Sequence, residues 1–402
     1  MKVIQINATC RLGSTGNICY EISRVLTEER MENLVFYSSG HTNYEKGHKY
    51  MSDFETKCGA LSSRILGNWG FNTYFATKRL VSRLKSESPS VVHLHNIHGH
   101  NCHLGVLLTY LKESRTKVIW TFHDCWAFTG YCMHYDMIGC EKWKYCCKEC
   151  PQYRDYSWFF DNSRRLFVKK KELLKGLALT IVVPSKWMSD QVSKSFLREY
   201  PVKVINNGID LSIYNFKSES FKTKIGIPDN FKLILGVAFG WNQKKGLDVF
   251  LRLSEMLPNN YKIVLVGTDE ETEKQIPERI ISIHRTKNQT ELAEIYSSAD
   301  VFVNPTREEN YPTVNMEALA CGTPVITFNT GGSAEIIDSS CGVAVEKNDI
   351  ESMKRAIIRV CEGKAFTKEA CLKRAESFDM HKRFQEYIDL YNEVAHDRTS
   401  KG

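Results

Sequence analysis

Two glutamates eight residues apart, Glu309 and Glu317, flank a turn that contains Pro312. The apolar run at 301–304 predicts a strand before the turn, and Pro312-Thr313 suits the first turn of a helix after it. Glu309 would then lie on the loop and Glu317 about one turn inside the helix. Because a helix N-terminus offers unpaired amides and the positive end of its dipole, the segment predicts a phosphate site. The alternative is that both carboxylates only solvate the surface.

Cysteines form a second group that could do chemistry. Six of the 14 fall within 26 residues: Cys125, Cys132, Cys140, Cys146, Cys147 and Cys150. The spacing of Cys132, Cys140, Cys147 and Cys150 could enclose a structural zinc ion in four thiolates. Only one pair has the close spacing of a zinc ribbon, and Cys146 is an alternative member. Reduced loop thiols, and a redox or iron–sulfur role, remain alternatives.

Histidines gather at two places in the first half of the chain. His123-Asp124 ends a predicted strand, where a lone histidine is more often structural than catalytic. The stretch 95–103 reads HNIHGHNCH and raises a second metal possibility. Histidines on a loop after a strand more often form hydrogen bonds, and we favour that interpretation.

Short apolar runs alternate with segments of helical periodicity around these residues. The predicted strands are 1–7, 91–94, 118–122, 179–184, 203–206, 233–237, 262–266, 280–284, 301–304 and 324–327. Strands alternating with helices such as 105–112 predict an α/β protein with parallel sheets covered on both faces. The turn-rich stretch 206–210 divides the chain into predicted domains 1–205 and 206–402, and an amphipathic helix begins near 381.

Composition excludes several protein classes. The 402 residues include 54 basic and 47 acidic side chains, a net charge of +7, and 42% are hydrophobic. Such a chain is neither disordered nor collagen-like, and its length predicts two or three domains. No apolar run approaches the ~20 residues that span a bilayer, and the first residues lack the apolar core of a signal peptide. We therefore expect a soluble, cytoplasmic protein with free or metal-bound thiols.

The segment 309–325, ENYPTVNME followed by ALACGTPV, resembles the Glu-x7-Glu motif of the retaining glycosyltransferases of family 4. GGSAE at 331–335 and the segments 181–187, 204–214 and 297–306 match that family in order. The resemblance covers nearly the whole chain. It implies the GT-B architecture, which has two facing Rossmann-like doubly wound domains, here with a C-terminal helix. Domain 1–205, with its cysteine-rich loop 125–150, would bind the acceptor, and domain 206–402 the nucleotide-sugar donor.

The resemblance also implies residue roles. It assigns Glu317 to the ribose hydroxyls of the donor, Glu309 to hydroxyls of the transferred sugar, and Lys245 to the diphosphate. A carboxylate suits vicinal hydroxyls because it accepts two charge-assisted hydrogen bonds, and helix amides can stabilise the leaving diphosphate. His123 would bond a sugar hydroxyl, and Asp124 would fix it or touch the acceptor. The remaining implied donor-binding residues are Gly16, Lys244, Asn310, Tyr311, Thr313 and Val314.

Two departures bear on the chemistry. The arginine that the family usually has five residues before the lysine is replaced by Gly240, so either Lys244 supplies the second charge or Lys245 and backbone amides suffice. No Asp-x-Asp pair occurs in the sequence, so we expect catalysis that needs no metal ion or other cofactor. Without an obvious carboxylate nucleophile, the family resemblance implies a front-face mechanism.

Residues 164–175, RRLFVKKKELLK, combine six basic side chains with apolar ones at helical spacing. They predict either a solvated helix face or a peripheral contact with anionic lipid at the inner membrane face. Nucleic acid is not an expected partner. HNIHG at 95–99 and the segment 123–143 look similar to bacterial capsule and O-antigen transferases. The expected function is therefore sugar transfer to a growing, lipid-linked surface polysaccharide. The alternatives are a GT-B nucleotide-sugar epimerase or hydrolase, and a non-enzymatic zinc-bearing scaffold.

Overall fold

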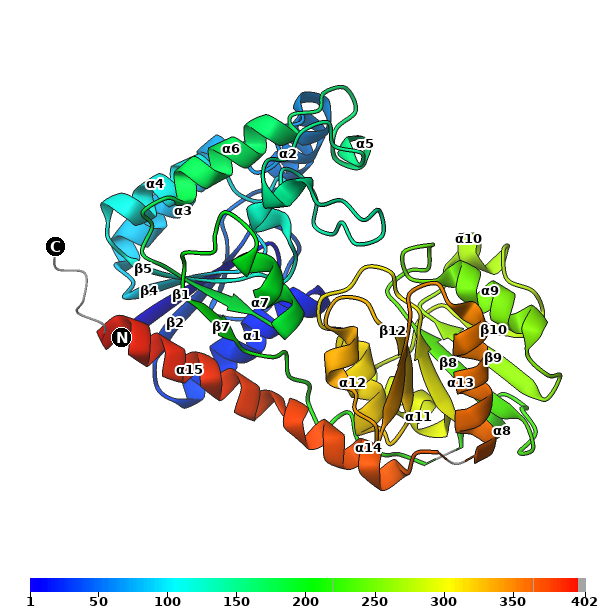
Figure 1. Ribbon diagram of the computed structural model, residues 1–402. Helices are drawn as coiled ribbons and strands as arrows, with labels where there is room; N and C mark the ends of the chain where they lie inside the picture. The colour runs from blue at the N-terminus through cyan, green and yellow to red at the C-terminus, as the bar shows by residue number, and fades with distance from the viewer. Residues whose placement is uncertain (219, 364, 397–402) are drawn as a thin grey trace. The chain divides into compact units, whose positions relative to one another are not determined.

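The computed structural model describes residues 1–218, 220–363 and 365–396, which form two compact units (Figure 1). The first unit contains residues 1–135, 139–205 and the described residues from Arg383 onward. The second unit contains Asp136–Ile138 and Asn206–Lys382. Each is built on a parallel sheet, as the sequence predicts.

The first unit has a seven-stranded parallel sheet in the order β3-β2-β1-β4-β5-β6-β7. Its strands are β1 (Lys2–Asn7), β2 (Glu32–Tyr37), β3 (Gly47–Lys49), β4 (Val91–Leu94), β5 (Lys117–Thr121), β6 (Leu179–Val183) and β7 (Val202–Val204). Its helices are α1 (Gly13–Glu28), α2 (Asp53–Leu66), α3 (Tyr74–Glu87), α4 (Leu104–Glu113), α5 (Tyr153–Tyr156), α6 (Ser163–Leu174) and α7 (Lys186–Ser193). Short 3₁₀ turns lie at Trp126–Phe128 and Lys142–Lys144.

The second unit has a six-stranded parallel sheet in the order β10-β9-β8-β11-β12-β13. Its strands are β8 (Lys232–Val237), β9 (Tyr261–Val266), β10 (Ile280–Ile283), β11 (Val301–Asn304), β12 (Val325–Phe328) and β13 (Gly342–Val345). Its helices are α8 (Phe221–Lys224), α9 (Leu247–Met256), α10 (Glu270–Glu273), α11 (Gln289–Ser298), α12 (Thr313–Ala320), α13 (Ile350–Gly363) and α14 (Lys368–Ala375). Further 3₁₀ turns lie at Ser333–Ile336 and Glu376–Phe378.

Helices cover both faces of each sheet (Figure 1). In the first unit, α3, α4 and α6 lie on one face and α1 and α15 (Met380–His396) on the other. In the second unit, α9 and α13 pack on one face and α11, α12 and α14 on the other, each face with its own buried apolar cluster. Because both faces are covered, the central strands are almost wholly buried, which explains why they appear in the sequence as continuous apolar runs.

The predicted strands 91–94 and 301–304 coincide with β4 and β11, and the other predicted strands differ at their ends by one or two residues. The sequence reading did not name β2, β3 and β13. Helix α1 begins at Gly13, so Gly16, one of the implied donor-binding residues, lies in its first turn. A side chain at Gly16 would approach Thr9 Oγ1 to 2.7 Å, so the close approach of helix and loop requires glycine there.

The predicted boundary after residue 205 coincides with the boundary between the units, but two segments group differently from the predicted domains. Residues from Arg383 belong with the first unit, because Tyr387 and Tyr391 of α15 are buried there. Their hydroxyls bond Thr121 Oγ1 at 3.2 Å and His93 Nδ1 at 2.6 Å. Asp136–Ile138 group with the second unit. None of the described helices is long and apolar enough to cross a membrane.

Candidate active site

Strand order places two loops of the second unit together. Strands β8 and β11 are neighbours at the centre of the sheet, where the direction of winding reverses. Such a switch point is where parallel α/β sheets bind ligands, beyond the carboxyl ends of the strands. The loop after β8, residues 238–246, contains both candidate lysines, and the loop after β11, residues 305–312, contains Glu309. Hydrogen bonds from Arg307 N and Thr306 Oγ1 to Lys244 O join the two loops.

The charged side chains of these loops pair one to one. Lys245 Nζ lies 2.8 Å from Glu309 Oε2, and Lys244 Nζ lies 3.1 Å from Glu308 Oε2. Glu308 is buried, whereas Lys245 and Glu309 are both partly exposed. The structure therefore brings together Lys244, Lys245 and Glu309, and it adds Glu308, to which the sequence analysis gave no role.

Arg307 holds this pair of loops in place. Its two terminal nitrogens each lie 2.7 Å from one carboxylate oxygen of Asp248, and its Nε bonds Asn348 Oδ1 at 2.6 Å. Such two-pronged pairing fixes orientation as well as distance. Arg307 and Asp248 are 59 positions apart, so no local pattern identifies the pair. The guanidinium is engaged in this scaffold and does not replace the arginine missing at Gly240.

Two glycines permit the close approach of these loops. Gly246 has a φ of +78°, and a side chain there would come within 2.5 Å of Pro305 O. Gly331 has a φ of +56°, and a side chain there would come within 1.8 Å of Glu309 O. Gly331 belongs to the GGSAE segment, and its neighbour Gly332 donates a 2.7 Å hydrogen bond to Asn310 O. These glycines thus position the Glu309 loop.

Gly240 is different, because its φ is +84° but a side chain would meet nothing within 4 Å. Glycine is favoured here by the backbone conformation alone.

Helix α12 begins at Thr313, as predicted from Pro312, and Pro312 provides no side-chain cap for its amides. Asn315 anchors this end of the helix, because its Oδ1 accepts a 2.8 Å bond from Asn304 at the end of β11. Of the other predicted donor-binding residues, Asn310 and Tyr311 are buried on the loop, and Thr313 and Val314 are half-buried in the first helical turn.

Glu317 lies one turn inside α12, as predicted, and its side chain is almost wholly buried. Burial raises its pKa to about 7, although hydrogen bonds from Tyr296 and Thr313 oppose the shift. Tyr296 OH lies 3.2 Å from Glu317 Oε2. Near neutral pH this carboxyl can exist in either protonation state, and only the ionised state accepts charge-assisted hydrogen bonds on both oxygens.

In the first unit, His123 and Asp124 follow β5 and have different partners. Asp124 Oδ2 lies 3.1 Å from His98 Nε2, and Asp124 Oδ1 accepts a 2.9 Å bond from the amide of Trp126. Burial alone would raise the pKa of Asp124, but these two partners hold it below its ordinary value. His123 Nε2 lies 3.1 Å from His95 Nδ1, and loss of hydration lowers the pKa of His123 to about 4. His123 is therefore neutral at physiological pH.

Three of the four histidines of 95–103 have separate hydrogen-bond partners. His95 bonds His123, His98 pairs with Asp124, and His103 Nδ1 accepts from the amide of Val106 at the start of α4. Within the described ranges, no three histidine, cysteine, aspartate or glutamate side chains are grouped so that they could hold a metal ion. Sequence reasoning missed Gln5 and His93, which support this group from inside the sheet. Both are polar residues in otherwise apolar strands, and that was the available signal.

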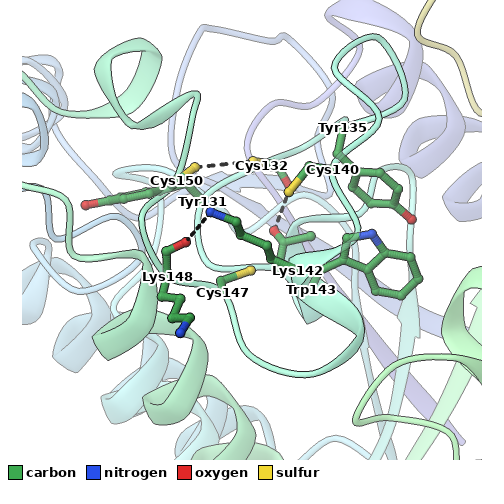
Figure 2. A pocket seen from close by; sticks show the side chains of 10 residues that line it. Tyr131, Cys132, Tyr135, Cys140, Lys142, Trp143, Cys147, Lys148 and Cys150 are labelled. Carbon is green, nitrogen blue, oxygen red and sulfur yellow. Dashed lines mark hydrogen bonds between the residues drawn. The ribbon is translucent and has the colours of Figure 1, made fainter.

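The four cysteines predicted to bind zinc line one pocket of the first unit (Figure 2). Cys132 Sγ and Cys150 Sγ lie 3.9 Å apart, and Cys147 Sγ accepts a 3.2 Å bond from the amide of Gly130. The Cys132–Cys150 hydrogen bond raises the pKa of Cys132 and lowers that of Cys150. All fourteen cysteines lie within the described residues as free thiols, and no three of them converge on a metal position. Zinc binding stays a prediction.

The basic segment 164–175 forms α6 and its first following residue, as predicted. Five of its six basic side chains are exposed. Lys170 instead points inward, where its Nζ donates to Trp126 O and lies 4.1 Å above the Trp126 ring. Burial lowers the pKa of Lys170 to about 7. Lys170 therefore does not belong to the solvated face that the sequence pattern predicts.

Two sequence-family models match the chain. The model described as Glycosyltransferase Family 4 matches residues 15–213, and that described as Glycosyl transferases group 1 matches residues 217–378. Together they span both units and every loop described above except the residues before position 15.

Individual relatives agree with these matches. A putative colanic acid biosynthesis glycosyl transferase, WcaC, of Escherichia coli K12 is 22% identical over 98% of this chain and 100% of its own length. An Escherichia coli UDP-Gal:alpha-D-GlcNAc-diphosphoundecaprenol alpha-1,3-galactosyltransferase is 26% identical over 50% of this chain and 56% of its own length. The crystal structure of Anabaena Alr3699/HepE in complex with UDP and glucose has a TM-score of 0.68 at 14% identity, over 98% of this chain and 100% of that one. The fold is thus GT-B, and the chain belongs to the glycosyltransferases that combine a Glycosyltransferase Family 4 domain with a Glycosyl transferases group 1 domain.

Proposed function

We propose that this protein is a retaining glycosyltransferase that moves a sugar from a nucleoside diphosphate to a lipid-linked, growing bacterial surface polysaccharide. The observation that carries the proposal is the pairing of Lys245 with Glu309 beside the start of α12. A nucleotide sugar offers a partner to each: its diphosphate suits the lysine and the helix amides, and its hydroxyls suit the carboxylate. Glu317, one turn further on, would accept the ribose hydroxyls in its ionised state.

In this scheme the donor replaces an internal ion pair. Lys245 and Glu309 are both partly exposed, so their separation costs little free energy. Lys244, paired with the buried Glu308, would add positive charge nearby. Two lysines and the amides of α12 would then balance the developing charge of the leaving diphosphate, and the proposed transfer needs no metal ion.

In the proposed mechanism the anomeric configuration of the sugar is retained because the reaction takes place on one face of the sugar. The bond between the anomeric carbon and the phosphate oxygen breaks, and the acceptor oxygen forms its new bond on the same face of the sugar. The acceptor proton passes to the leaving phosphate oxygen. His123, neutral near pH 7, would hold a hydroxyl of the reacting sugar.

Relatives support the acceptor and the donor classes. WcaC is named for colanic acid biosynthesis, the galactosyltransferase acts from UDP-Gal on a diphosphoundecaprenol-linked sugar, and HepE holds UDP and glucose. The test is incubation of the purified protein with a panel of UDP-sugars and a polyprenyl-diphosphate sugar, with and without EDTA. We expect an α-linked product from an α-linked donor, with its anomeric configuration read by NMR, and no effect of EDTA. Inversion, a metal requirement, or donor turnover without acceptor would contradict the proposal, and the last would indicate an epimerase or hydrolase.

Access to a lipid-linked acceptor would be helped by a surface of the first unit that we call the aromatic edge: Trp158, Phe159 and Phe160. All three side chains are at least half exposed, and Trp158 N donates to Arg64 O near the end of α2. Exposed Leu61, Ile65 and Leu66 of α2 and the basic side chains of α6 lie in the same unit. Tryptophan and phenylalanine with basic neighbours suit the interface of an anionic membrane.

Vesicle co-sedimentation tests this peripheral location. We expect binding to phosphatidylglycerol-containing vesicles that weakens as salt rises, and that weakens further in Trp158→Ala/Phe160→Ala. Phe239→Ala, which removes an exposed phenylalanine of the second unit, is the matched control. Equal binding to neutral vesicles, or no loss in the double variant, would contradict a membrane role for the aromatic edge.

The structural zinc ion in the four-thiol pocket is a separate proposal. It requires further sulfurs to join the Cys132–Cys150 pair. Elemental analysis of protein purified without chelator should give about one zinc per chain, and Cys150→Ser should lose it. Metal-free protein with all pocket thiols reactive would contradict zinc binding.

A further inference from the structure

A line of buried polar groups runs from helix α1 through the sheet of the first unit to His123. Gln5 Nε2 lies 2.9 Å from Cys19 O, and Gln5 Oε1 lies 3.1 Å from His95 Nε2. His95 Nδ1 in turn lies 3.1 Å from His123 Nε2. Gln5 and His95 are almost fully buried. In such surroundings each polar atom must find a partner of the correct type.

Donor and acceptor types fix the direction of every bond in this line. Cys19 O is a carbonyl and can only accept, so the amide nitrogen of Gln5 must face it. Gln5 Oε1 therefore faces His95 and accepts, which requires a proton on His95 Nε2. Neutral imidazole carries only one such proton, so His95 Nδ1 has a lone pair.

The last bond sets the state of His123. Since His95 Nδ1 is an acceptor, the proton between the two rings belongs to His123 Nε2. Both imidazoles are neutral, because burial lowers the pKa of His95 and of His123. The lone pair of His123 therefore lies on Nδ1.

Ring geometry favours this arrangement. The rings of His95 and His123 are inclined by only 15° with centroids 5.4 Å apart, as expected when two nearly coplanar rings meet through their nitrogens. His93 lies against His95 with a centroid separation of 3.9 Å, and is itself held by Thr121 and Tyr391. Close packing of this kind restricts rotation of the His95 ring.

We propose that His95, oriented by Gln5, is a positioning residue that fixes His123 as the Nε2–H tautomer, so that His123 Nδ1 accepts a hydrogen bond from a hydroxyl of the donor sugar. The ligand it selects is then a sugar with an O–H at that position. The tautomer follows from the first unit alone, whereas its use on a sugar rests on the proposed function.

Long-range ¹H–¹⁵N NMR of histidine-labelled protein tests the tautomer without any turnover. The His123 signals, assigned from their loss in His123→Gln, should show a protonated Nε2 and an unprotonated Nδ1. In Gln5→Leu the oxygen that holds the proton on His95 Nε2 is removed, so the His95 tautomer is no longer fixed and the His123 signals should move toward a mixture of the two tautomers. Asn33→Leu is the matched control, because it removes a buried neutral amide of the same sheet whose hydrogen bonds go to Ser23, Thr27 and Met31. Its His123 tautomer should remain unchanged.

A wild-type His123 protonated at Nδ1, or averaged between tautomers, would overturn the inference even if sugar transfer is confirmed. An unchanged tautomer in Gln5→Leu would do the same, as would an equal shift in Asn33→Leu. Conversely, absence of transferase activity would leave the NMR result standing and would reject only the proposed function.

Donor analogues test the hydrogen bond itself. A deoxy sugar lacks the hydroxyl, and a deoxyfluoro sugar can accept weakly but cannot donate. If His123 Nδ1 accepts, both analogues at the contacted position should bind about tenfold more weakly than the parent UDP-sugar. Binding of the fluoro analogue close to that of the parent, with loss only for the deoxy analogue, would show that His123 donates and would overturn the assignment.

Discussion

The two units hold their candidate site residues by different means. In the second unit, Lys245 and Glu309 meet as an ion pair between two loops, both partly exposed. In the first unit, His123 is held through the buried side chains of His95 and Gln5 by hydrogen bonds between neutral groups. An exposed ion pair contributes little stability, and a ligand that offers both charges a new partner can replace it. Buried neutral groups that are hydrogen-bonded in series cannot exchange partners without leaving one polar group unsatisfied. Such a series therefore fixes the orientation of His123.

The strongest test of this contrast removes the cation. Lys245→Met should lower kcat/KM by about 100- to 1000-fold, because one charge that stabilises the leaving diphosphate is lost. The melting temperature should change little, since the pair with Glu309 is partly exposed. Steady-state kinetics and thermal unfolding measure the two effects. Lys274→Met, at an exposed lysine after α10, is the control. A large loss of stability with normal kinetics would make Lys245 a structural residue.

Glu317 shares one property with each group of residues. It is ionisable like Lys245 and Glu309, and it is buried like His95. Its pKa is raised from 4.5 to about 7. Below pH 4.5 the carboxyl is protonated in folded and unfolded chains alike. Between pH 4.5 and 7 the unfolded chain loses the proton first, so the free energy of unfolding falls as pH rises, by about 3 kcal/mol in total. Glu317→Gln should abolish this fall, as measured by denaturant unfolding from pH 4.5 to 8.

Donor binding should depend on pH in the opposite direction. The ionised carboxylate accepts hydrogen bonds on both oxygens, so affinity for a UDP-sugar should increase as pH rises through about 7. Calorimetric titration of wild type against Glu317→Gln separates this effect from other groups. Equal affinity and equal pH dependence in the two proteins would remove Glu317 from the ribose site.

A substitution of Arg307 tests whether the Lys244–Glu308 and Lys245–Glu309 ion pairs depend on the hydrogen bonds that fix their two loops. Lysine at this position keeps the charge but cannot bond both oxygens of Asp248 and also Asn348. Arg307→Lys should lower the free energy of unfolding by about 1–2 kcal/mol, since a partly buried charge-assisted bond is lost. It should also weaken donor binding, because the loops that carry Lys245 and Glu309 lose their alignment. Unfolding at fixed pH and UDP-sugar titration measure both, and normal binding in a destabilised variant would limit Arg307 to stability.

The sequence predicts the second-unit site better than the first-unit one, for a physical reason. Glu309, Pro312 and Glu317 lie on one continuous strand–loop–helix segment, so their spacing determines their placement. The strand runs 91–94 and 301–304 are likewise local and were placed correctly. The three-residue edge strand β3 is only half-buried and leaves no apolar signal.

Partners far apart in the chain are absent from any local pattern. Gln5 and His95 are separated by 90 positions, and Arg307 and Asp248 by 59. Lys170 shows the same limit, because helical spacing places it among solvated lysines although the fold turns it toward Trp126. In the first two cases neighbouring strands bring the residues together, and the order of strands in a sheet cannot be read from one segment.

The smallest expected effect concerns His93, which packs against the hydrogen-bonded series of neutral side chains Gln5, His95 and His123. Tyr391 of α15 bonds His93 Nδ1 at 2.6 Å, and both are buried. Tyr391→Phe keeps the ring but leaves this nitrogen without its partner, so the free energy of unfolding should fall by about 1–2 kcal/mol. UDP-sugar affinity should stay within twofold of wild type, because the charges of the second unit are untouched. If affinity falls as much as in Arg307→Lys, buried neutral bonds would govern donor binding as strongly as the ion-pair scaffold, and the contrast between the units would fail.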